Sequence, residues 1–536
     1  MTSAGKELNS PVVLKPSRKA GLASSVGRAR ASSGANRFRS LSTAHAPSER
    51  RRPVRILKFG GTSLDGALCL ARVAAIIGEA ARPANVAVIA SATAGTTDQL
   101  LQAGKAAETG DGPLVADILD RVHAAHLATA AKLLRSSELR ASVVRKIDDL
   151  LGSCRKACLD VMAARKLTSR ERDLISGFGE RLSIPLLAGA LVERGMASEP
   201  IEATELIVTD SNYGEAEPLV NRTREMCAAR LRPLVSAGVV PVITGFIGAT
   251  SSGLLTTLGR GGSDYSATII AAALKADEVV IWTDVDGIMS ADPRMVPGAR
   301  LVSEISYQQA SELAFFGAKV LHPKTLDAIA HAGIPLWVRN TSTPESLGTR
   351  ITPKIPHSRP VAKAVASTEQ VTLLTITGVV ANQCQTRARA VEAINRVAQH
   401  VLLQAGSPSP DGLALVVCSV STGAVLNALR GEFRSEFRTG SLQEMRIDSS
   451  IALVTAVGSK LSHGVSHAQQ TLENAGVEVI ATSTTVSGCS MSFLVPVKDA
   501  ARAQLILHRE LIVNLVPLDT DHSRVRAAES EAYGAD

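Results

Sequence analysis

The stretch Leu258–Asp264, LGRGGSD, runs directly into the alanine-rich segment YSATIIAAAL at 265–274. Three glycines in seven residues disfavour a regular helix or strand, because glycine loses the most backbone entropy when it is ordered. The alanine-rich segment favours a helix, and Ser263 and Asp264 are good N-cap residues. The pattern predicts a strand, a glycine loop and a helix N-terminus, whose free N–H groups bind anions.

Short apolar runs before and after this loop predict further strands. They lie at 54–59, 86–90, 239–247, 278–283 and, as the last strand, 335–339. Runs of this kind are typical of parallel strands buried on both faces. Helices are predicted at 65–81, through 99–170, around 311–320 and at 322–333, with a loop-to-helix element at 174–181. The alternation predicts an α/β domain whose functional loops lie at the carboxyl ends of its strands.

The pattern changes after a segment rich in Pro, Ser, Thr and Lys at 342–360, which predicts a linker. Beyond it, strands and helices are shorter, and a β-α-β-β-α-β order occurs twice, about 80 residues apart. The predicted domains are therefore a basic extension (1–52), an α/β domain (54–345), a linker (346–365), two small α+β units (366–445 and 446–520) and a tail (521–536).

Composition is that of a soluble protein with several domains. The chain has 536 residues, 45% of them hydrophobic and 20% charged, and no apolar run of the length that a membrane helix needs. Seven scattered cysteines favour a reducing compartment and no disulfide framework. Cys154 and Cys158 lack further ligands at metal spacing, so we interpret them as packing residues. These features predict a cytoplasmic location.

Positive charge is concentrated at the N-terminus. The net charge is +8, and residues 1–52 contribute +9, so the remainder sums to −1. The extension lacks interleaved aromatic residues, which argues against nucleic-acid binding. Its composition predicts disorder, either as an extended start or as an organellar transit peptide, the alternative that would change the location.

Several charged residues stand beside glycine turns, where each has a chemical and a structural interpretation. Lys58, in KFGG, follows a strand and suits a transferring phosphoryl group, or is a surface lysine. Glu180, in GFGER, is a carboxylate presented from a flexed loop, or a helix-surface glutamate. Arg260 suits a bidentate grip on a carboxylate. Asp264 could be only an N-cap.

Two further groups are equally open. Asp284 and Asp286 follow a strand and are either ligands for Mg²⁺ or nucleotide hydroxyls, or turn residues. Lys319 is either a surface lysine or a cation aimed into the site from an apolar segment.

Six collinear motifs together resemble the aspartate kinases of the amino-acid kinase superfamily. They are KFGGTS (58–63), GFGER (177–181), TLGRGGSDYSA (257–267), WTDVDG (282–287), DPR (292–294) and GAKVLHP (317–323). The resemblance implies a three-layer α/β/α kinase domain with a mainly parallel sheet, followed by two ferredoxin-like ACT domains. It implies transfer of the γ-phosphoryl group of ATP to the β-carboxylate of L-aspartate.

The resemblance also implies roles for residues. Lys58, Asp264 and Lys319 would be catalytic, with Asp264 organising the lysines. Aspartate would be bound by Thr97, Glu180, Arg260 and Ser263, with Arg260 on its α-carboxylate and Glu180 on its ammonium. ATP, carrying Mg²⁺ that no protein ligand holds, would be bound by Lys58, Gly60, Gly61, Thr62, Thr283, Asp284, Arg294 and Lys319.

The ACT-like units imply a homodimer or larger homo-oligomer and an amino-acid effector, lysine or threonine. Their effector loops, at 378–385 and 458–464, differ in sequence from the usual effector loops of the family. Two rival functions stay open. One is phosphorylation of glutamate or N-acetylglutamate, and the other is a catalytically silent amino-acid sensor.

Overall fold

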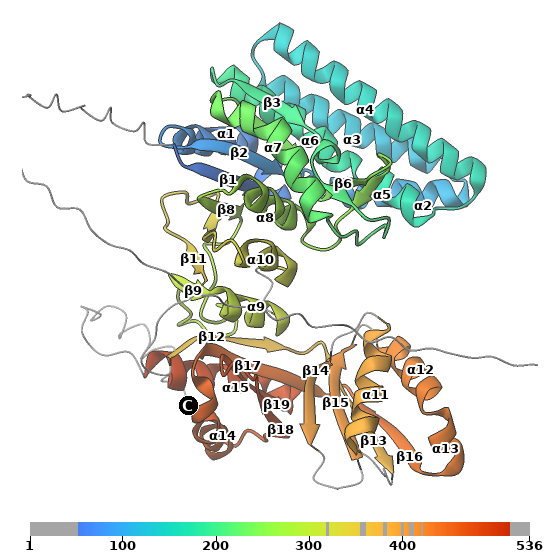
Figure 1. The fold of residues 1–536 in the computed structure, drawn as a ribbon, viewed down its shortest axis with the longest axis vertical. Helices are drawn as coiled ribbons and strands as arrows, with labels where there is room; N and C mark the ends of the chain where they lie inside the picture. Colours follow the sequence, from blue (N-terminus) through green and yellow to red (C-terminus); the bar gives the residue numbers. More distant parts are fainter. Residues whose placement is uncertain are drawn as a thin grey trace, which may run out of the picture. The chain divides into compact units, whose positions relative to one another are not determined.

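A mixed eight-stranded sheet lies at the centre of the N-terminal domain (Figure 1). The structure is a computed structural model that describes residues 52–317, 321–353, 361–378, 383–397, 401–406, 412–419 and 422–514. The strand order is β3-β5-β2-β1-β8-β10-β11-β9, and every neighbouring pair is parallel except β10 and β11. The strands are β1 (Val54–Phe59), β2 (Asn85–Ala90), β3 (Ser198–Ile201), β5 (Val240–Thr244), β8 (Glu278–Thr283), β9 (Glu304–Ser306), β10 (Leu336–Asn340) and β11 (Thr349–Thr352).

Helices cover both faces of this sheet, which confirms the three-layer prediction. Side chains alternate along β1, so that Leu57 and Phe59 pack into one core while Ile56 packs into the other. The first core is closed by α1 (Gly66–Ala81), α2 (Thr96–Thr109), α3 (Gly112–Leu133), α4 (Ser137–Ala164), α5 (Ser169–Ser176) and α6 (Phe178–Glu193). The second is closed by α7 (Val220–Ser236), α8 (Gly262–Leu274), α9 (Tyr307–Phe315) and α10 (Pro323–Ala330).

Two predicted elements near the glycine loop differ from the observed ones. The segment 174–181 is not a loop leading into a helix, because only Gly177 separates α5 from α6. The predicted strand 239–247 is broken after Thr244 by Phe246, whose φ is 65°. It resumes as β6 (Ile247–Thr250), which pairs with β4 (Val208–Thr209) and β7 (Leu255–Thr257) in a small separate sheet. The last strand of this small sheet, β7, ends at Thr257, directly before the glycine loop.

The α5–α6 stretch, Ser169–Glu193, is long and apolar enough to cross a membrane. In the structure 89% of its apolar 18-residue window is buried. It is therefore a core helix. Its apolar residues pack in the first hydrophobic core, against the sheet.

The C-terminal residues form two small sheets with helices, as predicted for ACT-like units. The first unit contains β13 (Val371–Gly378), α11 (Gln383–Asn395), β14 (Val401–Gly406), β15 (Gly412–Cys418), α12 (Thr422–Glu432), α13 (Arg434–Thr439) and β16 (Leu442–Asp448). The second contains β17 (Ile451–Ser459), α14 (Val465–Asn474), β18 (Ala481–Thr484), β19 (Ser490–Pro496), α15 (Ala500–His508) and a π-helix at Arg509–Val513.

The two units are not simply consecutive. Strand β12 (Val361–Thr368) precedes the first unit in the chain but pairs with β17 in the sheet of the second, whose order is β12-β17-β19-β18. The sheet of the first unit has the order β14-β15-β13-β16. The prediction of two consecutive units is therefore wrong for β12, which precedes the first unit in the chain but belongs to the sheet of the second.

Two segments of the predicted linker are also strands. Strand β11 pairs with β10 and β9, so 335–339 is not the last strand of the main sheet. Residues 361–365 belong to β12. The burial of Ile351 and Thr349, which are both completely buried, explains why β11 is ordered. The predicted extension 1–52, except Arg52, and the predicted tail 521–536 lie outside the described residues.

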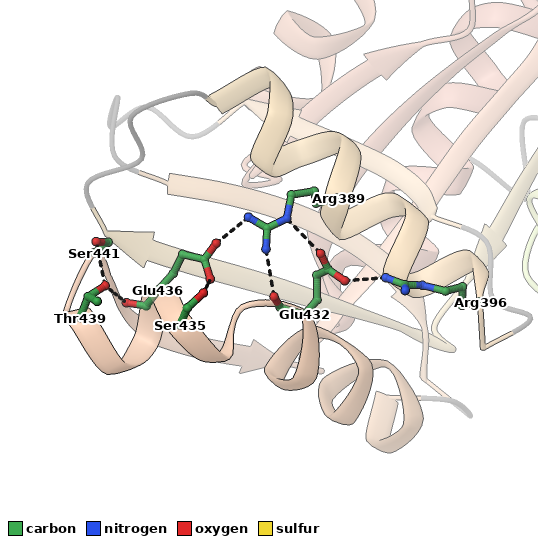
Figure 2. A network of polar contacts seen from close by, with 7 residues as sticks. All are labelled: Arg389, Arg396, Glu432, Ser435, Glu436, Thr439 and Ser441. Atoms are coloured by element: carbon green, nitrogen blue, oxygen red, sulfur yellow. Dashed lines mark hydrogen bonds and ion pairs between the residues drawn. The ribbon is translucent and has the colours of Figure 1, made fainter. Parts of the chain in front are cut away.

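An ion-pair network joins the helices of the first C-terminal unit (Figure 2). The Arg389 guanidinium, on α11, donates from Nε to Glu432 at 2.9 Å and from Nη1 to Glu436 at 2.5 Å. It also lies over the ring of Phe433, at 4.8 Å from the centroid. Arg396 donates to the second oxygen of Glu432 at 2.6 Å. Arg389 therefore fixes α11 against both α12 and α13.

Candidate active site

A cavity of about 450 Å³ opens at the carboxyl ends of β1 and β2. Its walls come from the end of β1, the loop after β2, the start of α6 and the glycine loop before α8. Lining residues are Lys58, Gly61, Ser91, Ala92, Thr93, Ala94, Gly95, Thr97, Asp98, Glu180, Phe246, Gly259, Arg260, Gly261, Gly262, Ser263 and Asp264. All four residues predicted to bind aspartate, and two of the three predicted catalytic residues, are among them.

Two helix N-termini border this cavity. Helix α2 has Gly95 as its N-cap, with φ 73°, and α8 has Gly261, with φ 69°. A left-handed N-cap favours glycine, since a Cβ there clashes with the following carbonyl. The prediction that Ser263 and Asp264 are caps is wrong, because both lie in the first turn of α8. The N–H groups and dipoles of two helices suit an anion in this cavity.

Lys58 and Asp264 form an ion pair at one wall of the cavity. Their Nζ and Oδ1 atoms are 2.6 Å apart, and the side chains are only 11% and 16% exposed. Lys58 lies near the end of a central strand and Asp264 in the first turn of α8, so the pair joins sheet and helix. The structural interpretations, a surface lysine and an N-cap aspartate, do not fit these positions.

Glu180 is a buried carboxyl, not one presented from a loop. It lies in the first turn of α6 and is 4% exposed. Burial raises its pKa to about 8, against the opposing effects of a 3.2 Å hydrogen bond from the Ala92 N–H and of the charge on Lys58. Its Oε2 atom has no hydrogen-bond partner among the described residues. A buried acceptor of this kind suits a cationic ligand group, which would favour the ionised form.

Arg260, Thr97 and Ser263 complete the cavity wall. Arg260 is exposed and its loop lines the cavity, so its guanidinium stays available to solvent and ligand. Ser263 is held closely against Gly245, because a Cβ added to that glycine would lie 2.6 Å from the Ser263 Cβ and Oγ. Thr97 is in the first turn of α2.

Asp173 supports the glycine loop, a role that the sequence analysis missed. Its carboxylate accepts hydrogen bonds from the N–H and hydroxyl of Thr257, at 2.8 and 2.9 Å, and from the Gly214 N–H at 2.9 Å. Thr257 directly precedes LGRGGSD, so these bonds fix the loop's entry. The available signal was an aspartate within the buried face of α5. Phe246, which also lines the cavity, gave no signal.

The residues predicted to bind ATP lie mostly outside the cavity. Gly61 lines it, whereas the Gly60 N–H donates to the Trp282 carbonyl at 3.2 Å and Thr62 is exposed. Thr283, at the end of β8, donates to Asp284 at 3.1 Å. Arg294 forms an ion pair with Asp292 at 2.6 Å.

Two other predicted groups have different outcomes. Asp286 accepts hydrogen bonds from Asn340 at 2.8 Å and Thr343 at 3.0 Å, the structural alternative of a turn residue. Lys319 lies outside the described residues. Among the residues that the structure describes, no group of three His, Cys, Asp or Glu side chains is placed to hold a metal ion. Cys154 and Cys158 are fully buried in the first core, as packing residues.

Comparison with known proteins identifies the family to which this chain belongs. The model of the amino acid kinase family matches residues 53–340, more than half of the chain. The lysine-sensitive aspartokinase 3 of Escherichia coli is 32% identical over 464 residues, which cover 85% of this chain and 98% of that protein. A bifunctional aspartokinase/homoserine dehydrogenase of Buchnera aphidicola is 28% identical, and the match spans 57% of its length.

Among solved structures, E. coli aspartokinase III in complex with aspartate and ADP has a TM-score of 0.72 at 30% identity. That match covers 85% of this chain and 99% of the other. The chain belongs to the amino acid kinase family and, within it, to the aspartokinases.

Proposed function

We propose that this chain transfers the γ-phosphoryl group of ATP to the β-carboxylate of L-aspartate, giving 4-phospho-L-aspartate, the first step towards lysine, threonine and methionine. The observation that carries the proposal is the convergence of Lys58, Asp264, Glu180 and Arg260 on one cavity. Aspartate has two carboxylates and one ammonium. A site for it needs both signs of charge, and this cavity has both.

Aspartate binding follows from the charges. Arg260 grips the α-carboxylate, since a guanidinium matches a carboxylate bidentately. Glu180 receives the ammonium through its unpaired Oε2. Thr97 and Ser263 complete the contacts at the two helix N-termini. The β-carboxylate is then directed towards Lys58 and the phosphoryl group.

Phosphoryl transfer then depends on position and charge. A β-carboxylate oxygen forms a bond to the γ-phosphorus, and the bond to the bridging oxygen breaks, so ADP leaves with the electron pair. The nucleophile is already an anion at neutral pH, so no general base is needed. Lys58 and the N-terminus of α8 stabilise the charge on the transferring group, while Asp264 orients the lysine. Lys319 is assigned to the leaving phosphate.

ATP is assigned to the side of the cavity that leads to the end of β8. Gly60, Gly61 and Thr62 line the phosphate path, and Thr283, Asp284 and Arg294 contact the rest of the nucleotide. Mg²⁺ would come with ATP as part of the substrate, and it would supply positive charge that neutralises the phosphates.

The C-terminal units have a regulatory and an assembly role in this proposal. An E. coli aspartokinase III structure in complex with lysine and aspartate matches this chain with a TM-score of 0.69 at 30% identity. On that likeness we assign an amino-acid effector, lysine or threonine, to the ACT-like units. The resemblance of these units to ACT domains is the basis for assigning a homodimer or larger homo-oligomer to the whole protein. A cytoplasmic location suits such an enzyme.

Initial rates of ADP release by the purified full chain test the activity. We expect release that depends on both aspartate and ATP. Folded protein that binds ATP without aspartate-dependent release would instead be the silent sensor. Addition of lysine or threonine at subsaturating aspartate in the same assay tests the effector.

Glu180→Ala separates aspartate from N-acetylglutamate as the substrate. An acetylated amine has no positive charge, so its binding gains nothing from the Glu180 carboxylate. We expect the variant to lose aspartate turnover. If the variant and the unchanged protein phosphorylate N-acetylglutamate at the same rate, the substrate is N-acetylglutamate and not aspartate.

A further inference from the structure

The loop between β8 and β9 is fixed to the second C-terminal unit at one buried serine. Ser290 is 1% exposed, and its backbone pairs with Arg300, with an N–H to carbonyl distance of 2.8 Å. The loop is thereby closed at its base. Its tip carries Asp292 and Arg294, whose side chains pair with each other at 2.6 Å.

The hydroxyl of Ser290 makes two hydrogen bonds. Its Oγ accepts a hydrogen bond from the Arg300 N–H at 2.9 Å and lies 2.9 Å from Nε2 of His508. Burial and the Arg300 charge lower the pKa of His508 to about 4, so near neutral pH its imidazole has no net charge. The hydrogen bond between the hydroxyl and the neutral imidazole bridges the loop and helix α15.

Other bonds hold the same junction together. The Ser290 carbonyl accepts from the Val365 N–H, on β12, at 2.8 Å. Gln504, on α15, donates to the Val365 carbonyl at 2.8 Å. Arg300 donates from Nη2 to the carbonyl of Ile512, in the π-helix, at 3.2 Å. The loop thus contacts α15, β12 and the π-helix, all of which belong to the second C-terminal unit.

The position of Arg294 consequently depends on this junction. Its side chain is 86% exposed and takes its place from a loop anchored at Ser290 and Arg300. We propose that Ser290 and His508 are positioning residues for the nucleotide: their buried hydrogen bond sets the loop that brings Arg294 to ATP. This inference rests on the proposed function, which assigns Arg294 to the nucleotide.

Binding of MgADP to the full chain without aspartate, measured by titration calorimetry, tests the inference. Ser290→Ala and His508→Leu each remove the bond between these two buried side chains. We expect each to weaken MgADP binding about threefold to tenfold, the size of one hydrogen bond. The KM for ATP should rise by a similar factor, and the KM for aspartate by less than twofold.

Two further variants control for a merely structural effect. His508→Gln retains a hydrogen-bonding amide, with both a donor and an acceptor, near the position of Nε2, so its MgADP affinity should be close to that of the unchanged protein. Ser459→Ala removes a different bond between the domains, a 2.8 Å contact from Gln309, and should leave MgADP affinity unchanged. Cooperative thermal unfolding identifies the variants that fold, and Ser290→Ala carries the test if His508→Leu does not.

The outcomes distinguish this inference from the proposed function. Unchanged MgADP affinity in folded Ser290→Ala protein, or an equal rise in both KM values, overturns the inference alone. An unchanged protein that binds MgADP but releases no ADP with aspartate overturns the function, while the affinities of the variants still decide the inference. A chain that does not bind MgADP overturns both.

Discussion

Lys58 and Asp264 are 206 positions apart in the sequence, yet their side chains meet at 2.6 Å across the junction of β1 and α8. The carboxylate balances the lysine charge and holds the ammonium at the wall of the cavity. An anionic phosphoryl group entering between two helix N-termini thus meets a cation that is already oriented. Such preorganisation is the main source of electrostatic catalysis.

Lys58→Ala should lower kcat by about 10²–10³, since a single preorganised charge-stabilising group typically contributes this much. The measurement is the rate of ADP release at saturating ATP and aspartate. Lys132→Ala, at an exposed lysine of α3, is the matched control and should keep the full rate. A rate for Lys58→Ala within twofold of the control would contradict the assignment of this lysine.

Aspartate affinity should depend on the ionisation of Glu180. Burial raises its pKa to about 8, so below that pH the group is mostly protonated and cannot pair with an ammonium. We expect the KM for aspartate to fall as pH rises from about 6.5 towards 8. The Glu180→Gln variant should bind aspartate weakly, with little pH dependence over this range. A similar pH dependence in both proteins would assign the titration to another group.

Glu180 should also make the fold less stable as pH rises. Its pKa is 4.5 in the unfolded chain and about 8 when buried, so the folded state binds more protons between these values. Stability therefore falls with rising pH across that window. Glu180→Gln removes this effect, and its melting temperature relative to the unchanged protein should increase from pH 5 to pH 8. A constant difference would contradict the burial of an ionisable group here.

Gly245→Ala should disturb the wall of the cavity. The added Cβ would meet Ser263 at 2.6 Å, so the N-terminus of α8 must move. We expect a loss of stability of about 1–3 kcal/mol, the usual cost of overpacking, and a raised KM for aspartate. Gly152→Ala, on α4 with open space around it, is the control and should stabilise by about 0.5–1 kcal/mol. Equal effects of the two substitutions on unfolding would refute the close contact.

The Arg389 network should stabilise the first C-terminal unit above acidic pH. Hydrogen bonds from Ser435 and Arg389 lower the pKa of Glu436 to about 2, from 4.5 when unfolded. This contribution is present above pH 4.5 and is lost as pH falls towards 2. Arg389→Ala should cost about 1–2 kcal/mol at pH 7, measured by urea unfolding, and less at pH 3. Arg446→Ala, at an exposed ion pair on β16, is the control.

Much of the fold could be predicted because local patterns agree with it. The runs 54–59 and 278–283 are strands with those bounds, since both are buried parallel strands flanked by turn residues. The run 239–247 misled because an apolar sequence does not reveal a left-handed Phe246. The place of β12 in the second sheet was also not predicted. Its partner β17 is distant in the sequence, and a local pattern does not indicate which strand pairs with it.

Some of the site residues could likewise be predicted from the sequence, and others could not. Motif residues on the cavity, such as Lys58 and Arg260, were predictable because glycines beside charges indicate close approach to a ligand. The burial of Glu180 was not, since both interpretations, a carboxylate on a flexed loop and a helix-surface glutamate, placed it in solvent. Asp173 was missed because its three acceptor contacts come from residues 41 and 84 positions away.

The pairing of β12 with β17 has a consequence for the order in which the chain can be built and cut. Thr368 faces Leu453 in this pair, so the chain leaves the second sheet and re-enters it at neighbouring points. The whole first unit, residues 371–448, is therefore an insertion between two adjacent strands of the second. Excision of the insert with a short connection leaves the outer sheet intact, whereas a cut between the units deprives β12 of its partner. During synthesis, β12 must wait for the entire inserted unit before it can complete a sheet.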